Sequence, residues 1–377
     1  MQPGRAYARI ISTGQEGGLC QNLNEITLRK VTSMSLTPKE RLYSALKLKP
    51  VDRIPVLQPL QTGTVELMES SGVFWPEAHR DADKMARLSY EAHRVVGFEG
   101  VRVPFDVNVE SEALGCILDY DKGRHKGLDI QPLVRDFPIA AKEDIAKIQI
   151  PDPAKTGRMP VVVEAVKLLC ARVGPDIPVL AAIVGPFMVA GQIRGVDNLM
   201  RDLARDPGFS HELLEKCCQS CSKYAHALVE AGADVIVIID ATASPDLVSP
   251  KFYQEYAKTY AKRIADEVSV PTILHICGNA SAILPYMAEV ADGITFDALV
   301  DMAYAKEAVN GKAALCGNVD VNSTLLFGPI DKIEENVRYC IDNGTNLLTT
   351  ACGIPPRTPT ENLIAMVKAG KTYGVRK

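Results

Sequence analysis

A histidine and two cysteines stand beside apolar runs in a pattern that could hold a metal ion. His275 and Cys277 follow the run 270–274, and Cys352 follows the run 346–351. Short apolar runs of this kind are typical of buried strands. One imidazole and two thiolates would supply three zinc ligands and leave a coordination position open, as in catalytic rather than structural zinc sites. The alternative is three ordinary core side chains, because a single His-x-Cys pair is a weak motif.

The neighbouring residues favour the metal site over that alternative. Gly278 follows Cys277 and Gly353 follows Cys352, so turns would free both thiols from regular strand pairing. Two thiolates and an imidazole suit zinc better than calcium, magnesium or manganese. Zinc held by two thiolates suits the binding of an external thiol as its thiolate, whereas hydrolytic zinc sites use more histidine and carboxylate ligands. The ligand set therefore predicts alkyl transfer to sulfur.

The overall composition is that of an ordinary globular protein. The chain has 377 residues, of which 47% are hydrophobic and 23% charged, and its formal net charge is -4. The mild acidity, without a basic run, argues against nucleic acid and against an anionic membrane surface as partners. No apolar run approaches the roughly 20 residues that span a bilayer, so we expect no membrane segment.

The cysteines predict a reducing compartment. The chain has 10 of them without the spacing of a disulfide framework, so we expect free or metal-bound thiols and a cytoplasmic location. Cys217, Cys218 and Cys221 could be taken for a second metal cluster. They lie inside the helical pattern 207–231, however, and buried helical thiols are the better interpretation.

Strand and helix patterns alternate along the chain from residue 37. Eight short apolar runs are candidate strands: 54–57, 100–103, 179–184, 235–239, 272–274, 293–296, 313–316 and 346–349. Helical patterns separate most of them: 81–96, 160–173, 207–231, 250–268, 281–290, 330–343 and 360–373. Continuous apolar runs are typical of strands covered on both faces. The alternation predicts an α/β protein with a (β/α)8 TIM barrel. A doubly wound sheet is the rival, but no glycine-rich phosphate loop follows an early strand.

The domain boundaries follow from the same patterns. Thr37, Pro38 and Glu40 form a capping box that opens a helix. We therefore expect a single barrel domain over 34–377 and an N-terminal extension over 1–33, which we expect to be poorly ordered. The long stretch 107–154 is expected to contain a hairpin around 117–120 and a loop insertion.

Polar residues follow several of the candidate strands. Asp106 follows the second strand, Asp240 the fourth, Asp297 the sixth and Asn318 the seventh. Barrel enzymes place their chemistry at the C-terminal ends of the strands. We therefore expect these residues at the same rim as His275, Cys277 and Cys352.

The chain resembles a known family at several separate segments. These are 37–42 (TPKERL), 61–66 (QTGTVE), 75–79 (WPEAH), 101–106 (VRVPFD), 232–234 (GAD), 275–279 (HICGN), 352–353 (CG) and 358–362 (TPTEN). Together they mark a member of the uroporphyrinogen decarboxylase superfamily. More closely, the chain resembles the methylcobamide:coenzyme M methyltransferases of methylotrophic methanogens.

The resemblance implies a zinc-bearing (β/α)8 barrel with His275, Cys277 and Cys352 as the metal ligands. It also implies that coenzyme M binds zinc through its thiol. The thiolate then takes the methyl group of methyl-Co(III) from a small methyl-corrinoid protein, which leaves Co(I). Methylcobamide, carried by that partner, is thus the expected methyl donor, and methanogenesis is the expected context.

Roles for further residues follow from this resemblance. Asp297 and Asp240 are the expected catalytic residues: Asp297 as an exchangeable fourth zinc ligand or, alternatively, a helix cap, and Asp240 as a polar group that lines the pocket. Asp106, Arg102 and Asn318 are the expected cofactor-binding residues, although a capping or turn role would also suit Asp106 and Asp240. Arg102 and Arg357 are the candidates for binding the sulfonate of coenzyme M.

Three other functions compete with this one. Uroporphyrinogen decarboxylase needs arginines for its substrate's carboxylates, but the stretch 58–63 (QPLQTG) has none. A methyltransferase acting on tetrahydrofolate would not need the paired thiols. A barrel that only binds a corrinoid or a partner protein remains open. The sequence decides neither the oligomeric state nor the methylated compound that feeds the corrinoid.

Overall fold

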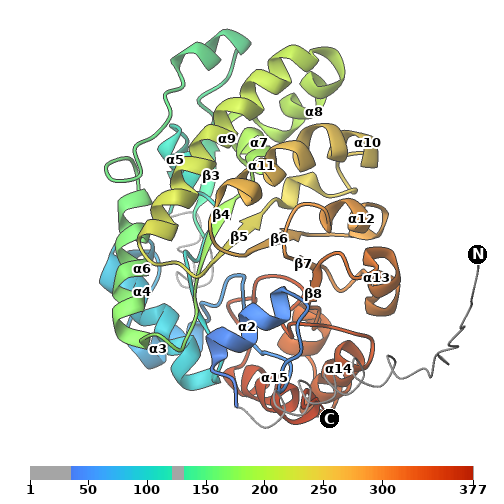
Figure 1. Cartoon of the computed structure of the whole chain (residues 1–377). Helices are drawn as coiled ribbons and strands as arrows, with labels where there is room; N and C mark the ends of the chain where they lie inside the picture. Colours follow the sequence, from blue (N-terminus) through green and yellow to red (C-terminus); the bar gives the residue numbers. More distant parts are fainter. Residues whose placement is uncertain (1–34, 121–130, 377) are drawn as a thin grey trace, which may run out of the picture.

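Six parallel strands lie side by side in a computed structural model that describes residues 35–120 and 131–376 (Figure 1). In sheet order they are β1 (Val101–Val103), β4 (Val179–Val184), β5 (Val235–Ile239), β6 (Thr272–Ile276), β7 (Gly293–Phe296) and β8 (Ala314–Cys316). Each strand pairs in parallel with the next strand in this order. Every position of β4, β5 and β6 is buried, as their continuous apolar sequences require.

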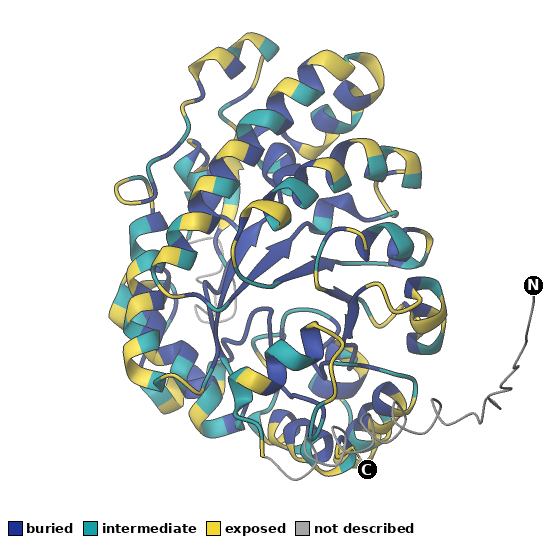
Figure 2. Ribbon diagram, viewed as in Figure 1, coloured by how far each residue is buried: buried dark blue, intermediate teal, exposed yellow. Residues whose placement is uncertain are grey.

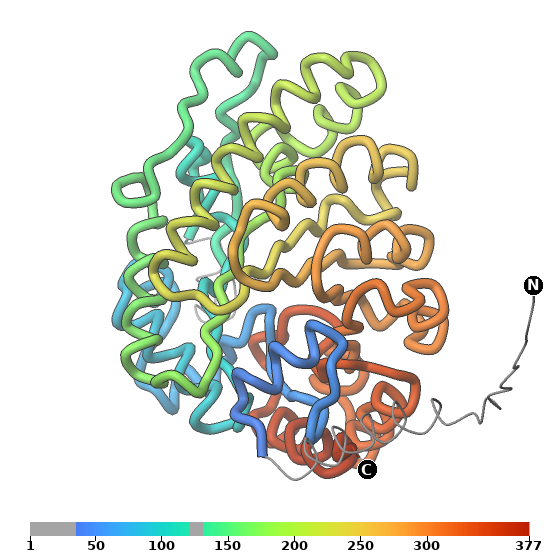
Figure 3. Tube along the Cα trace, in the orientation of Figure 1, coloured from blue at the N-terminus to red at the C-terminus, as the bar shows by residue number. Residues whose placement is uncertain are grey.

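Two further segments close the sheet into a barrel. Val56 pairs with Leu348, and Leu347 pairs with Cys316, through isolated parallel bridges, while the Glu99 amide donates to the Val56 carbonyl. We call the segments 54–58 and 345–352 the seam. Figure 3 shows the beginning of the described chain beside its end, as this closure requires. The prediction of a (β/α)8 barrel is confirmed.

The seam departs from the sequence prediction in one respect. The runs 54–57 and 346–349 were expected as strands, but they pair only through single bridges. Pro55 has no N–H to donate, which interrupts a ladder in the first run. In the second run the Asn346 side chain accepts the Leu315 amide at 2.9 Å, so a side chain takes part in the pairing.

Helix α2 (Pro38–Leu46) closes the N-terminal end of the barrel. Thr37 and Glu40 form the expected capping box at its start. Leu42 and Leu46 belong to the same buried apolar cluster as Val237 and other residues of the barrel interior. Tyr43 donates to the carbonyl of Asp234, the residue before β5, at 3.2 Å. In Figure 1 the helix lies in front of the strands.

The other helices surround the barrel, with buried residues toward the strands and exposed residues outward (Figure 2). The α-helices are α3 (Val65–Ser71), α4 (Ala82–Glu91), α5 (Val109–Ala113), α6 (Met159–Val173), α7 (Pro186–Arg194), α8 (Val196–Arg205), α9 (Pro207–Glu230), α10 (Pro250–Phe252), α11 (Thr259–Glu267), α12 (Leu284–Met287), α13 (Met302–Val309), α14 (Ile330–Asp342) and α15 (Thr360–Tyr373). Short 3-10 and π-helical turns are η1 (Glu77–His79), η2 (Ala92–Val96), η3 (Lys142–Lys147), η4 (Ala241–Ala243), η5 (Tyr253–Lys258), η6 (Ala280–Ile283) and η7 (Val321–Leu326). Among the helices described here, none is long and apolar enough to cross a membrane.

A hairpin interrupts the alternation after β1. Strands β2 (Ile117–Asp119) and β3 (Leu133–Asp136) pair antiparallel, which confirms the hairpin expected in the long stretch 107–154. Cys217, Cys218 and Cys221 are buried in α9, and burial raises the pKa of each thiol, as expected for core cysteines. The extension predicted for 1–33 lies outside the described residues.

Candidate metal centre

The alternation of β6 brings His275 into the barrel. Ile273 belongs to the inner apolar cluster. His275 lies two residues and Cys277 four residues further along, so both continue the same inward face. The strand ends at Ile276, two residues later than predicted, so His275 lies within β6 rather than after it. The left-handed Gly278 (φ +72) then turns the chain directly after Cys277.

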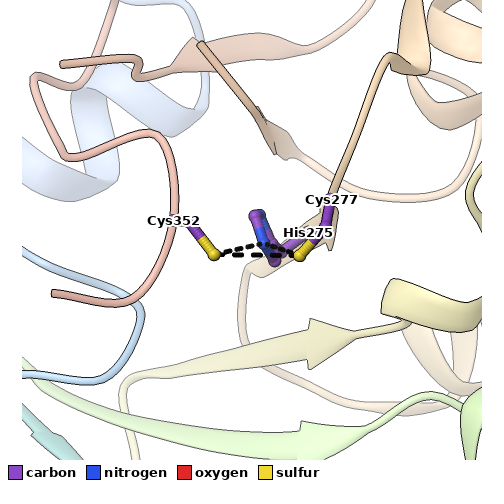
Figure 4. A group of neighbouring side chains, drawn as sticks. All are labelled: His275, Cys277 and Cys352. Carbon is purple, nitrogen blue, oxygen red and sulfur yellow. Dashed lines mark hydrogen bonds between the residues drawn. The ribbon is translucent and has the colours of Figure 1, made fainter. Parts of the chain in front are cut away.

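Cys352, at the end of the second seam segment, faces this pair from a separate loop (Figure 4). Its Sγ lies 3.8 Å from Nε2 of His275 and 3.8 Å from Sγ of Cys277. The third side of this triangle, from His275 Nε2 to Cys277 Sγ, is 3.1 Å. The sequence predicted that these residues converge, and the structure brings them together although Cys352 stands 75 residues from Cys277.

The two thiols are electrostatically unequal. The hydrogen bond from Cys277 lowers the pKa of the Cys352 thiol, with burial opposing the shift and the His275 ring adding to it. The same hydrogen bond, together with burial, raises the pKa of the Cys277 thiol. One negative charge is therefore shared by the pair, as expected where two sulfurs lie close in a buried site.

The donor set fits a zinc ion. One nitrogen and two sulfurs, all within 4.8 Å of one another, come from His275, Cys277 and Cys352, and within the described residues this group contains no carboxylate. Soft sulfur and imidazole donors select zinc over the hard cations. His275 is buried with Nε2 toward the thiols, and its Nδ1 has no partner in the described part of the chain. Nε2 is therefore the nitrogen available to a metal.

The Cys352 turn is held by a glutamine from the opposite side of the seam. The Gln58 amide donates to the Cys352 carbonyl at 3.2 Å and also to the Thr350 hydroxyl. Its own carbonyl accepts the Thr349 hydroxyl at 2.5 Å. Sequence reasoning used the stretch 58–63 only for its lack of arginines and missed these contacts. The signal available was a polar residue directly after the first apolar run.

A cavity of about 330 Å³ lies beside the three candidate ligands. A volume of this size suits a small organic ligand. Its walls are largely apolar, and side chains from widely separated parts of the chain contribute to it. The lining residues are Leu60, Gln61, Arg102, Phe105, Val107, Gln131, Met188, Ile239, Ala241, His275, Cys277, Cys352, Gly353, Ile354, Pro355 and Pro356.

Arg102 is the cationic side chain of this cavity wall. It is buried in β1, where its guanidinium donates to the carbonyl of Pro59 at 3.1 Å and to that of Pro104. Burial lowers the pKa of Arg102 to about 9, against the opposing effect of Asp106. Within the described residues no carboxylate forms an ion pair with it, so a cation faces an apolar cavity. Arg357, the other candidate, is exposed and does not line the cavity.

Asp297 follows β7 near the candidate ligands but outside their triangle. Its charge contributes to the raised pKa of Cys277, after the hydrogen bond to Cys352 and burial. Its side chain accepts the Leu299 amide at 3.1 Å. The alternative role of helix cap is wrong, because Asp301 caps α13. The role of Asp297 as a fourth ligand stays a prediction.

Asn318 lies behind the turn that carries Asp297. Its amide donates to the carbonyl of Asp297 at 3.2 Å and to that of Val300 at 2.8 Å. The side chain is buried and does not line the main cavity. Through these contacts Asn318 stabilises the turn that carries Asp297. Its predicted role in cofactor binding stays a prediction.

Asp240 contacts the start of α7 rather than the cavity. Its Oδ1 accepts the Met188 amide at 2.8 Å, and a Cβ added at Gly185 would lie 2.3 Å from its Oδ2. Burial raises the pKa of Asp240 to about 7, against the N–H groups of Met188 and Phe187. The capping role that the sequence left open agrees with these contacts. The predicted catalytic role stays a prediction.

Asp106 is occupied by a buried ion-pair network. Arg158 contacts its two oxygens at 2.7 and 3.0 Å, and Nδ1 of His79 lies 2.9 Å away. Burial alone would raise the pKa of Asp106, but Arg158 and His79 hold it well below its usual range. Asp106 does not line the cavity. Its expected role in cofactor binding stays a prediction.

Comparison with known proteins places the chain in a family. A model of the uroporphyrinogen decarboxylase family matches residues 37–373, and the chain therefore belongs to this family. The methylcobamide:CoM methyltransferase MtbA of Methanosarcina mazei is 42% identical over 341 residues, which cover 89% of this chain and 98% of that protein. The methylcobamide:CoM methyltransferase MtaA of Methanosarcina barkeri is 37% identical over 339 residues, with 89% and 98% covered.

A solved structure agrees with these relatives. A methyltransferase from Methanosarcina mazei superimposes with a TM-score of 0.85 at 38% identity, over 90% of this chain and 99% of that one. The resemblance inferred from the sequence, both to the family and to its methyltransferases, is confirmed, as is the assignment of the chain as a methyltransferase enzyme.

Proposed function

We propose that this enzyme moves a methyl group from a methylated corrinoid to the thiol of coenzyme M and that it depends on zinc. The observation that carries the proposal is the convergence of His275 Nε2 with the sulfurs of Cys277 and Cys352 beside a cavity. The names of the relatives that share most of this chain's length support the same reaction. The proposal places the enzyme in the cytoplasm and in methanogenesis, with the corrinoid carried by a small partner protein.

The residues of the chain divide the work between them. His275, Cys277 and Cys352 would hold zinc, which in such a site supplies Lewis acidity that lowers the pKa of an added thiol. The apolar cavity walls exclude water and keep the thiolate sulfur nucleophilic. Arg102 would bind the sulfonate, so that the two ends of coenzyme M are fixed and its sulfur is aimed at the mouth.

The transfer itself is a balanced displacement. A sulfur–carbon bond forms to the thiolate while the cobalt–carbon bond breaks, and the electron pair of that bond stays on cobalt, which passes from Co(III) to Co(I). The chain must therefore hold sulfur, methyl and cobalt in line. Asp297 is our candidate for occupying the fourth position when thiol is absent, since its charge already acts on Cys277.

Two alternatives are less well supported. A tetrahydrofolate nitrogen would not require the two thiols that converge here. Decarboxylation of uroporphyrinogen requires cations for many carboxylates, whereas the stretch 58–63 offers glutamines, of which Gln58 contacts the Cys352 turn.

Consumption of methylcobalamin by the zinc-loaded enzyme tests the proposal. We expect turnover with coenzyme M, and little with homocysteine or tetrahydrofolate under the same conditions. Turnover that proceeds equally well after removal of zinc, or with tetrahydrofolate as the acceptor, would exclude the proposed function.

Replacement of Arg102 by methionine tests the sulfonate site. Because a buried cation that pairs with an anion contributes on the order of 2–3 kcal/mol, we expect the KM for coenzyme M to rise about 30-fold or more. The KM for 2-mercaptoethanol, which lacks the sulfonate, should change little. An equal effect on both thiols would assign Arg102 to the barrel wall instead.

A further inference from the structure

The candidate ligands are fixed to the barrel by different means. His275 lies in β6, which is paired in parallel with β5 on one side and β7 on the other. Cys352 lies beyond the last bridge of the seam, Val319 with Thr350, between two backbone bonds, from Ala351 to the Val319 carbonyl and from Ile354 to the Gln61 carbonyl. Between these two backbone bonds, the Cys352 carbonyl accepts from a side chain, and we expect the position of the Cys352 sulfur to depend on that contact as well.

Both the nitrogen and the oxygen of the Gln58 side-chain amide form hydrogen bonds with this turn. Gln58 is 3% exposed, and its NH2 group donates both to the Thr350 hydroxyl and to the Cys352 carbonyl, 3.2 Å away. Its carbonyl accepts from Thr349 at 2.5 Å, which fixes the orientation of the amide. The Thr350 hydroxyl in turn donates to the Cys352 carbonyl. The network thus satisfies the amide and connects the first barrel segment to the ligand-bearing turn.

A second glutamine holds the far end of the same turn. Gln61 donates to the Ile354 carbonyl at 2.7 Å, and the Ile354 amide donates to the Gln61 carbonyl at 3.0 Å. A Cβ added at Gly353 would lie 3.1 Å from Cβ of Gln61, so the two segments pack closely. Gln61 also lines the cavity, whereas Gln58 does not. Gln58 therefore offers a test of positioning that leaves the walls of the substrate cavity unchanged.

We propose that Gln58 is a positioning residue that sets Cys352 against His275 and Cys277, so that the zinc affinity of the site depends on its side-chain amide. The inference rests on the proposed function only in taking the three residues as zinc ligands. Without the amide, the Cys352 carbonyl and the hydroxyls of Thr349 and Thr350 lose buried partners. The turn then relaxes toward water, and the third ligand is no longer held where the other two need it.

Gln58→Met tests the inference, with Gln192→Met as the matched control. Gln192 lies on α7 and also donates to a backbone carbonyl, that of Val107 at 2.7 Å, but it contacts none of the candidate ligands. Loss of a group that orients a metal ligand typically costs 10–100-fold in metal affinity. We therefore expect the zinc dissociation constant, measured by competition with a chelator, to rise about 10–100-fold in Gln58→Met and less than about 3-fold in the control.

A second readout separates positioning from general loosening of the fold. In the cobalt-substituted protein, the thiolate-to-metal absorption should weaken in Gln58→Met, while the zinc-free unfolding temperature falls no further than in Gln192→Met. If Gln58→Met fails to fold, Thr349→Val removes only the hydroxyl that orients the amide. We then expect a smaller loss of zinc affinity, about 3–10-fold, with Thr272→Val, at the opposite end of β6, as its control.

Unchanged zinc affinity in the folded Gln58→Met protein, or in Thr349→Val where the former does not fold, would overturn the inference. The proposed function fails in a different way. A wild-type protein that binds zinc through these residues but methylates no thiol would refute the proposed reaction. The zinc affinities of Gln58→Met and its control would still test the positioning role of Gln58.

Discussion

The two sides of the metal centre are built differently. On the β6 side, His275 continues the inward face of a strand that is hydrogen-bonded to both neighbours, so backbone pairing alone fixes its position. At the seam, backbone bonds such as those from Leu348 to Pro55 and from Ala351 to Val319 form only isolated bridges, and Gln58 adds side-chain contacts to the Cys352 turn. The comparison teaches that the candidate ligands of one metal centre can have unequal structural support.

The difference has an energetic meaning. A backbone hydrogen bond contributes about 1 kcal/mol net, and a ladder adds several that form or break together. The seam has fewer regularly spaced backbone bonds and depends in addition on a buried amide whose partners each lose a hydrogen bond when it is removed. Substitutions that leave the backbone unchanged are therefore able to move Cys352 but not His275.

The largest expected effect comes from the ligands themselves. We predict that His275→Ala and Cys352→Ala each lose zinc affinity by at least about 100-fold, with methyl transfer lost in parallel, because two remaining donors cannot hold the ion. Equilibrium dialysis against zinc, followed by metal analysis, measures the loss. Retention of tight zinc binding by Cys352→Ala alone would break the comparison, since the seam would then supply no ligand.

A smaller effect concerns the mobility of the two sides. Thr349, Thr350 and Cys352 have amides without a backbone acceptor in the described part of the chain, whereas β6 is paired on both sides. We therefore predict that these three amides exchange with solvent deuterium in the zinc-free protein at least about 10-fold faster than those of β6. Exchange followed by mass spectrometry of peptides from each region measures this. Addition of zinc should slow exchange at the seam more than in β6. Equal protection in the zinc-free protein would mean that the side chains alone make the seam as stable as a ladder.

The smallest effect is a pH dependence on the laddered side. Glu110 in α5 is buried and accepts the Val184 amide of β4 at 2.7 Å, and burial raises its pKa to about 8. A carboxyl group whose pKa is raised on folding favours the folded state least when ionised, so stability falls as pH rises from the ordinary pKa near 4.5 through about 8.

Glu110→Gln should remove this loss. We predict that the unfolding temperature of the wild type falls relative to that of the variant between pH 6 and pH 9, by a few degrees, which corresponds to on the order of 1–2 kcal/mol. Differential scanning calorimetry across this pH range makes the comparison. A constant difference between the two proteins would show that Glu110 does not titrate in it.

Much of the centre could be predicted because it obeys strand periodicity. Ile273, His275 and Cys277 share one face by simple alternation, and the apolar runs located the strands around them. Pro55 was visible in the sequence, but its effect depends on which strand lies beside it. The partners of Gln58 are about 290 residues away, at a contact that exists only once the barrel has closed. Local pattern carries no information about such a contact.

The capping role of Asp240 illustrates the same limit. The residue was correctly expected after the fourth strand, but its partner, the Met188 amide, belongs to α7, a helix that the sequence patterns did not indicate. Position along the chain therefore predicted correctly that Asp240 follows a barrel strand. Whether a rim residue faces the cavity or a helix start depends on the packing of neighbouring loops.

Helix α2 imposes an order on the reaction under the proposed function. Its leucines fill the N-terminal end of the barrel, so both substrates approach the metal centre from the opposite end. A corrinoid that presents its methyl group at this end of the barrel blocks the entrance for the thiol. Coenzyme M must then bind first, and the methylated product must leave last. Steady-state kinetics should accordingly show a compulsory sequence, with the methylated thiol competing against coenzyme M alone.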